Sequence, residues 1–278
     1  MKPYRILMIG LLLIGMSTQA QKIYVRGGFG AAVSTAADIS YHLTGISDST
    51  SWTAQTLATK KAGVGSGLPF VLAAGYKLSD NFSAELGIDY FYGFNVAVKD
   101  IFYYSPIESK GRGQMLSIVP AFVLTFPVEK FHPYARLGLK LGVLNSVVYN
   151  IHETYTYITQ NENTITVDLE SKSKDYGGIA IGVQAALGTD YAINENISLF
   201  GEIQVDGISY SPKHGKYLEY SENGADQMGN MTEKQKKWNY LKDIDYNKSI
   251  PDNQPWEKPR LNYRFGNVGL IVGVKFNL

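Results

Sequence analysis

Few residues in the chain are suited to chemistry, because it has four histidines and no cysteine. His42 and His214 fall in long polar segments and His132 in a short turn, whereas His152 follows an apolar segment and precedes Glu153. A histidine beside a carboxylate is a pairing that general acid–base or nucleophilic catalysis uses. The sequence places no nucleophile next to this pair. An exposed loop histidine is therefore the favoured interpretation, and we expect no enzyme.

Metal and phosphate motifs are also weak. Residues 243–249 alternate oxygen-bearing side chains as a calcium loop does, but Lys248 stands where glycine is needed and Gln254 where a bidentate glutamate would be. The glycine-rich residues 63–67 lack the lysine and the following helix of a phosphate loop. We therefore expect no metal and no cofactor.

Ten charged residues stand at alternate positions within otherwise apolar segments. The basic ones are Arg26, Lys77, Arg136, Lys140 and Lys275, and the acidic ones are Glu85, Asp89, Asp190, Glu202 and Asp206. Equal numbers of both signs can pair, whereas an unpaired buried charge would cost roughly several kcal/mol. We interpret the set as a paired network that fills an interior. A polar path for small solutes is the alternative.

Eight segments alternate apolar and polar side chains with a period of two, which is the pattern of β-strands. They are residues 23–33, 68–78, 82–96, 114–126, 133–147, 177–191, 197–209 and 262–278. Pro120, inside the fourth segment, predicts a bulge or a locally unpaired amide. The ten charges fall on the polar faces, so we expect apolar faces outward and charged faces inward.

The connections between these segments alternate in length. Short turns follow the second, fourth and sixth segments, whereas the long connections cover residues 34–67, 97–113, 148–176 and 210–261. Short turns on one side and long loops on the other are typical of bacterial outer-membrane barrels. The 20 tyrosines and 28 glycines suit curved strands with aromatic residues near their ends.

The first residues predict export. Lys2 and Arg5 precede an apolar run over residues 6–16, and the small residues before Gln21 predict cleavage between Ala20 and Gln21. We expect residues 1–20 to be a signal peptide and residues 21–278 a single barrel domain. Removing the signal leaves 24 basic against 25 acidic residues, which gives no reason to expect a nucleic-acid partner.

The chain resembles the eight-stranded outer-membrane β-barrel family of Gram-negative bacteria, the small porin-like group. The resemblance rests on the signal, the loop asymmetry, residues 133–139, residues 197–202 and the last strand. It implies an all-β, eight-stranded antiparallel up-and-down barrel in outer-membrane lipid, inserted by the barrel-assembly machinery. That machinery would read the end of the last strand, where Phe276 and Leu278 stand. We expect a monomer.

Three functions remain open from the sequence. The first is a non-enzymatic integral outer-membrane protein that displays its long loops for surface binding or adhesion. Trp238, Tyr240 and Trp256 could form the binding patch, or they could pack against other loops, and Thr232 with Gln235 predicts a short surface helix. The second is a narrow passive channel for small or apolar solutes. The third is a secreted soluble ligand-binding barrel with its apolar residues inside.

Overall fold

Eight antiparallel strands form the body of the molecule. The computed structural model describes residues 22–35, 64–102, 105–126, 128–158, 164–245 and 247–278. In ring order the strands are β1 (Ile23–Ser34), β2 (Gly67–Lys77), β3 (Phe82–Gly93), β5 (Ser105–Thr125), β6 (Phe131–Ile158), β8 (Ala180–Ala192), β9 (Ile197–Tyr210) and β15 (Asn267–Asn277). The proposed signal peptide and its cleavage site at Ala20 and Gln21 lie outside the described residues.

Pairing of β1 with β15 closes this ring. Val33 lies opposite Val268 and Val25 opposite Phe276, while the pairing of β5 with β6 completes the circle on the other side. Closure leaves no unpaired strand edge within the ring. The predicted eight-stranded antiparallel barrel is confirmed, with residues 78–81, 126–130 and 193–196 as the short connections at one end. We call this the short-turn end and the opposite one the long-loop end.

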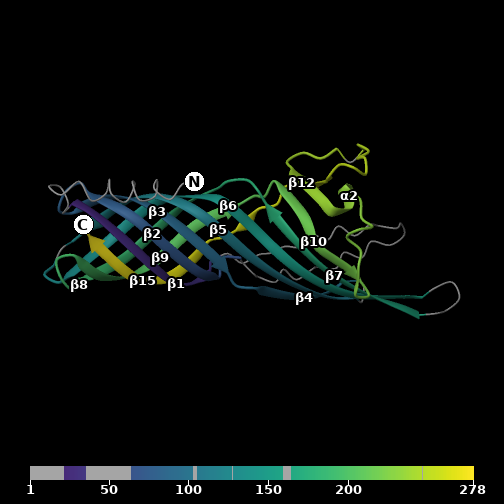
Figure 1. The fold of residues 1–278 in the computed structure, drawn as a ribbon, viewed down its shortest axis with the longest axis horizontal. Helices are drawn as coiled ribbons and strands as arrows, with labels where there is room; N and C mark the ends of the chain where they lie inside the picture. Colours follow the sequence, from purple (N-terminus) through teal and green to yellow (C-terminus); the bar gives the residue numbers. More distant parts are fainter. Residues whose placement is uncertain (1–21, 36–63, 103–104, 127, 159–163, 246) are drawn as a thin grey trace, which may run out of the picture.

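Besides the two-residue strands β11 (Ala225–Asp226) and β14 (Tyr263–Arg264), five further strands extend the sheet beyond the long-loop end, where the sequence predicted polar loops and one short surface helix. They are β4 (Val96–Phe102), β7 (Thr164–Tyr176), β10 (His214–Glu222), β12 (Lys237–Leu241) and β13 (Trp256–Pro259). Together with residues 105–113 of β5 and 146–158 of β6 they form one sheet, in the order β4, β5, β6, β7, β10, β12, β13. We call this sheet the wall, and Figure 1 shows it reaching well past the barrel.

The wall begins where β6 changes partners. β6 pairs with β8 as far as Gly142 and with β7 from Ser146 onward. A β-bulge at Val143, which has no partner in β5, lies at this switch. The bend is held by Asn145, whose amide nitrogen donates to the Gly142 carbonyl at 2.8 Å and the Gly178 carbonyl at 3.3 Å. Bulges of this kind redirect a strand.

Pro120 in β5 lies at a second irregularity of the β5–β6 pairing. The β5–β6 ladder has partners at Ile118 and Ala121 but none at the two residues between them, which include Pro120. A proline has no amide hydrogen to donate there. The predicted bulge does not occur at Pro120: the register with β6 is interrupted there, Pro120 keeps its partner Leu86 on β3, and the bulge lies at Val143.

The outward surface of the barrel is apolar. Exposed side chains from six strands include Phe29, Leu72, Leu86, Phe122, Leu187 and Leu270. Exposed aromatic residues form a row at Phe29, Phe70 and Tyr90, and a second group near the short-turn end includes Tyr76, Phe131 and Tyr191. Apolar side chains therefore face outward, which contradicts the soluble barrel with an apolar interior. Within the described residues no helix is long and apolar enough to cross a membrane.

Candidate functional site: the barrel interior and the groove on the wall

The barrel interior holds the charged set that the sequence singled out. Eight of the ten residues are buried, namely Arg26, Glu85, Asp89, Arg136, Lys140, Asp190, Glu202 and Asp206. Lys77 and Lys275 are partly buried near the short-turn end. They come from strands on all sides of the ring because the inward face of each strand collects alternate residues.

Glu202 is the centre of one ion network. Its carboxylate accepts hydrogen bonds from Arg26 Nη1 at 3.0 Å, Arg136 Nη2 at 2.6 Å and the Tyr134 hydroxyl at 2.7 Å. Arg26 also lies 3.3 Å from Glu85. Each of these side chains is buried, so the charges are compensated inside the protein and do not rely on water.

A second network lies closer to the long-loop end. Lys140 Nζ is 2.6 Å from Asp206 and 3.4 Å from Asp89, and the Gln184 amide donates to Asp89 at 2.7 Å. Near the short-turn end Lys275 pairs with Asp190 at 2.6 Å. These contacts join strands that are two or three places apart in the ring, so the side chains project into the interior of the barrel and fill part of its cross-section.

An apolar layer covers the charged interior at the long-loop end. Its buried members include Val64, Phe91, Met115, Val147 and Phe265. Phe265 packs edge-on against Phe91, with ring centroids 6.2 Å apart, and against Tyr210, with centroids 6.0 Å apart. A layer of packed apolar side chains therefore lies above the salt-bridged core at this end of the barrel.

The wall has its own buried centre at Asp175. Its carboxylate accepts hydrogen bonds from the Trp238 indole at 3.2 Å and from the hydroxyls of Tyr240 at 3.0 Å and Tyr263 at 2.5 Å. Burial raises the pKa of Asp175 above its ordinary value, while these hydrogen bonds and the charge of Lys258 oppose the rise. The Lys258 ammonium lies 3.8 Å from the centre of the Trp238 ring.

This centre corrects the predicted aromatic surface patch. Trp238 is only 5 % exposed and Tyr240 is partly buried, so both pack within the wall and are not available to a partner. Only Trp256 of the three is exposed, with Lys234 Nζ 5.0 Å from its ring centre. The sequence could not indicate that Trp238 is buried and Trp256 exposed, because both lie among polar residues.

The predicted surface helix is shorter than its sequence suggested. Helix α2 covers Glu233–Lys236 and carries the expected capping box between Thr232 and Gln235. The chain then continues as β12, which pairs with β10 and β13. Sheet pairing ends the helix after one turn, because burying Trp238 beside Asp175 requires an extended backbone.

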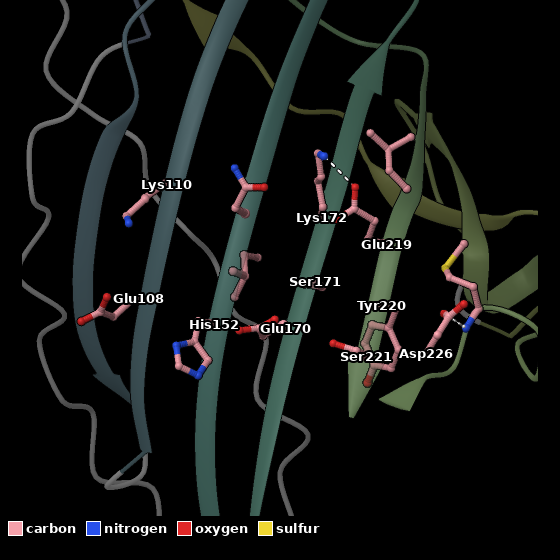
Figure 2. Close-up of a pocket in the computed structure, with 14 residues that line it drawn as sticks. Glu108, Lys110, His152, Glu170, Ser171, Lys172, Glu219, Tyr220, Ser221 and Asp226 are labelled. Atoms are coloured by element: carbon pink, nitrogen blue, oxygen red, sulfur yellow. Dashed lines mark hydrogen bonds and ion pairs between the residues drawn. The ribbon is translucent and has the colours of Figure 1, made fainter. Parts of the chain in front are cut away.

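A polar groove of about 690 Å³ lies on the outward face of the wall. It runs across β5, β6, β7 and β10, and Figure 2 shows its side chains projecting from these adjacent strands. The charged side chains that line it are Glu108, Lys110, Glu170, Lys172, Glu219 and Asp226, together with His152. Lys172 pairs with Glu219 at 2.6 Å. Acidic groups therefore outnumber basic ones along the groove.

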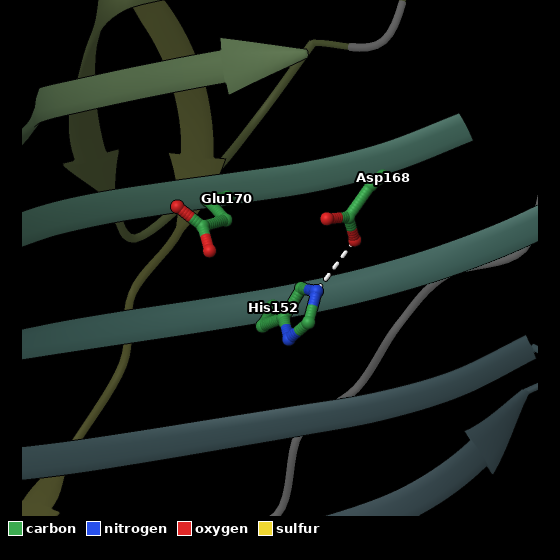
Figure 3. A group of neighbouring side chains, drawn as sticks. All are labelled: His152, Asp168 and Glu170. Atoms are coloured by element: carbon green, nitrogen blue, oxygen red, sulfur yellow. Dashed lines mark hydrogen bonds and ion pairs between the residues drawn. The ribbon is translucent and has the colours of Figure 1, made fainter. Parts of the chain in front are cut away.

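His152 lies at this groove, but its partner is not Glu153. The His152 Nε2 atom is 2.5 Å from Asp168 Oδ1 on β7, and Glu170 lies directly opposite His152 in the strand register (Figure 3). Neighbouring residues of a strand point to opposite faces, so Glu153 projects away from His152. The hydrogen bond from His152 holds the pKa of Asp168 below its ordinary value.

The last strand places both residues of the proposed assembly signal on the outside. Phe276 is exposed and pairs with Val25 on β1 and Ile197 on β9. Leu278 is also exposed, and its amide donates to the Ile23 carbonyl at 2.9 Å. Recognition by an assembly machinery stays a prediction.

No protein-family model and no curated protein matches the chain. Among solved structures, the chain is similar to Neisserial surface protein A (NspA), with 11% sequence identity and a TM-score of 0.39. The match covers 92% of this chain and 97% of that chain. A likeness this remote transfers no property, so the architecture rests on the strand pairing itself. An apolar exterior, exposed aromatic groups near both ends and a charged, paired interior define a transmembrane β-barrel of the outer-membrane type.

Proposed function

We propose that the protein is a non-enzymatic integral protein of the bacterial outer membrane that anchors and displays the wall at the cell surface. One observation carries the proposal: the barrel strands β5 and β6 continue without interruption into the wall. The apolar exterior of the barrel would sit in lipid, and the wall would stand above it in water. The short-turn end would then face the periplasm.

Surface binding would use the polar groove. Its backbone is held by sheet pairing on both sides. On the other face of the wall, Trp238 of β12 donates a hydrogen bond to Asp175 of β7. A groove on a rigid sheet loses little conformational entropy when a ligand binds. The excess of acidic side chains favours a polar ligand with positive charge, such as a basic peptide segment.

The absence of cysteine from the sequence allows a direct test of this arrangement. Single cysteines are introduced by Glu219→Cys on the wall and by Asp80→Cys in a short turn. Both side chains are exposed, so neither change disturbs packing. Intact cells are then treated with a membrane-impermeant maleimide, and the same treatment is repeated after the outer membrane is opened.

We expect Glu219→Cys to be labelled on intact cells and Asp80→Cys only after the membrane is opened. If only Asp80→Cys were labelled on intact cells, the short-turn end would face the outside and the proposed orientation would be wrong. Recovery of the protein in the aqueous fraction without detergent would overturn the membrane assignment. For the ligand, a fluorescent oligolysine should bind the detergent-solubilised protein more tightly than an oligoglutamate does, and Glu170→Lys should weaken that preference.

A further inference from the structure

Two adjacent strands of the wall bring an imidazole and two carboxylates together. The ligand atoms of His152, Asp168 and Glu170 all lie within 4.8 Å of one another (Figure 3). His152 comes from β6, whereas Asp168 and Glu170 are two residues apart on β7 and therefore project from the same face. We propose that these three side chains form a binding site for a divalent transition-metal ion, with Zn²⁺ as the best fit.

The donor set determines the class of ion. One imidazole nitrogen with carboxylate oxygens suits Zn²⁺ and related transition metals, whereas Ca²⁺ takes about six to eight oxygen ligands. Bonds from Zn²⁺ to nitrogen and oxygen are about 2.0 to 2.2 Å long, which puts neighbouring tetrahedral ligands roughly 3.4 Å apart. The His152 and Glu170 side chains are exposed, so rotation about their side-chain bonds can adjust the spacing from at most 4.8 Å to that separation.

His152 and Asp168 already lie in contact at the proposed site. The His152 Nε2 and Asp168 Oδ1 atoms are 2.5 Å apart, so they would separate by about 1 Å to bind one ion between them. Three protein ligands leave a fourth position open for water or for a group of a bound ligand. Glu108, directly opposite His152 on β5, adds another carboxylate beside this position.

Asp168 is held in place by groups outside the proposed ligand set. The Thr154 hydroxyl donates to Asp168 Oδ1 at 3.1 Å, and the Asp168 amide donates to the side-chain oxygen of Asn223 at 3.0 Å. The Asn223 amide donates in turn to the Asp168 carbonyl at 2.8 Å. Hydrogen bonds of this kind orient metal ligands and tune their affinity.

The electrostatic surroundings also favour a cation. Register places Glu108, His152, Glu170 and Ser221 side by side across four strands, with Asp226 paired to Ser221. This row has three carboxylates and no lysine. The next row contains Lys110, Asn150, Lys172 and Glu219, and its positive charges stand two residues along each strand from the acidic row.

The test uses the mature protein in detergent micelles with any affinity tag removed, because tag histidines bind Zn²⁺ themselves. Isothermal titration with ZnCl₂ should give one Zn²⁺ per chain. His152→Ala and Asp168→Asn should each weaken binding by about tenfold or more. His214→Gln, which changes an exposed histidine elsewhere on the wall, and Glu219→Gln, which changes a groove acid outside the triad, should bind as the wild type does.

A second readout identifies the ligands independently. Co²⁺ in a site of low coordination number gives intense visible absorption, and that absorption should disappear in His152→Ala but persist in His214→Gln. Heat-modifiable electrophoresis establishes that each variant keeps its barrel. Equal Zn²⁺ affinity in wild type and His152→Ala would overturn the proposal, as would no Zn²⁺ binding at all or tighter binding of Ca²⁺ than of Zn²⁺. None of these outcomes depends on the orientation tested by cysteine labelling.

Discussion

In the centre of the barrel, Arg136 Nη2 lies 2.6 Å from the Oε1 atom of Glu202. The other oxygen of the same carboxylate accepts from Arg26 and Tyr134. One carboxylate thus compensates two guanidinium groups that come from different sides of the ring. Because each arginine is buried, neither can replace this partner with bulk water.

Replacing Glu202 with glutamine should destabilise the barrel strongly. Glu202→Gln keeps the shape of the side chain but removes the charge, which leaves Arg26 and Arg136 undercompensated. We expect the free energy of unfolding to fall by about 3 to 5 kcal/mol. Urea titration of the protein in micelles, followed by the heat-modifiable gel shift, measures the change.

The exposed pair of Lys172 and Glu219 serves as the control. Glu219→Gln breaks an ion pair of similar length, but water screens both partners. Its cost should stay below about 1 kcal/mol. Similar losses in Glu202→Gln and Glu219→Gln would contradict the interior network as a source of stability.

The wild-type barrel should not conduct ions steadily. The pair of Lys140 and Asp206 and the apolar layer at Phe265 both lie across the path. In planar bilayers we expect no well-defined openings above the baseline. Regular channel openings from purified protein would show that these side chains move aside and would favour the passive-channel hypothesis.

Gly178 should tolerate no side chain, because it lies where the chain passes from the wall into β8. Its φ is +87°, and an added Cβ would stand 2.6 Å from the Ser211 carbonyl oxygen. Gly178→Ala therefore combines backbone strain of about 1 to 2 kcal/mol with a clash against main chain. In thermal unfolding, Gly178→Ala should lower the free energy of unfolding by more than backbone strain alone would.

Two other glycines separate these contributions. Gly224 has a φ of +76° but no atom within 4 Å of an added Cβ, so Gly224→Ala should show backbone strain alone. Gly201 has neither a positive φ nor a close neighbour, so Gly201→Ala should be nearly neutral. We expect Gly178→Ala to destabilise the protein most, Gly224→Ala less and Gly201→Ala least. The reverse order would show that neither backbone strain nor the clash determines the loss.

Trp238 and Trp256 should respond very differently to truncation. Trp238→Ala leaves a cavity beside Asp175 and removes one of its hydrogen-bond donors, which we expect to cost about 3 to 5 kcal/mol in the wall. Trp256→Ala removes an exposed ring and should cost less than about 1 kcal/mol. Limited proteolysis of the wall in otherwise intact barrels measures this difference, and equal cleavage rates would contradict it.

The barrel was predictable from sequence because lipid and core impose opposite demands on alternate residues. Glu85 and Asp89 stand among apolar neighbours in β3, so their inward direction follows from the period of two. The wall lacks that contrast. In β7 the run from Asp168 to Lys174 is largely polar, because much of both faces is near water, and no hydrophobic period marks it as a strand.

The groove could not be predicted for a related reason. The proximity of His152 to Asp168 depends on the register of the β6–β7 hairpin, and the contact of Lys172 with Glu219 depends on pairing between residues 47 positions apart. No local pattern specifies either register. The buried position of Trp238 likewise depends on a carboxylate, Asp175, that is distant in sequence.

The stability of the wall should depend on pH through Asp175. Because burial raises its pKa in the folded state, the folded protein holds the proton more tightly than the unfolded chain does. The stabilisation is complete below the ordinary aspartate pKa, and it is lost as pH rises through the raised folded-state value. In wild type we therefore expect the wall to become more resistant to denaturation on mild acidification.

Asp175→Asn removes this titration while keeping a hydrogen-bond acceptor for Trp238, Tyr240 and Tyr263. In the mildly acidic range, the stability of the wall in Asp175→Asn should change less with pH than the stability of the wall in the wild type does. Tryptophan fluorescence follows the transition in a background with Trp52→Phe and Trp256→Ala, where the buried Trp238 is the single tryptophan that remains. The prediction would be contradicted if the wild type lost stability on mild acidification while Asp175→Asn did not. That result would show that the hydrogen-bond donors and Lys258 keep the Asp175 carboxylate ionised and outweigh the effect of burial.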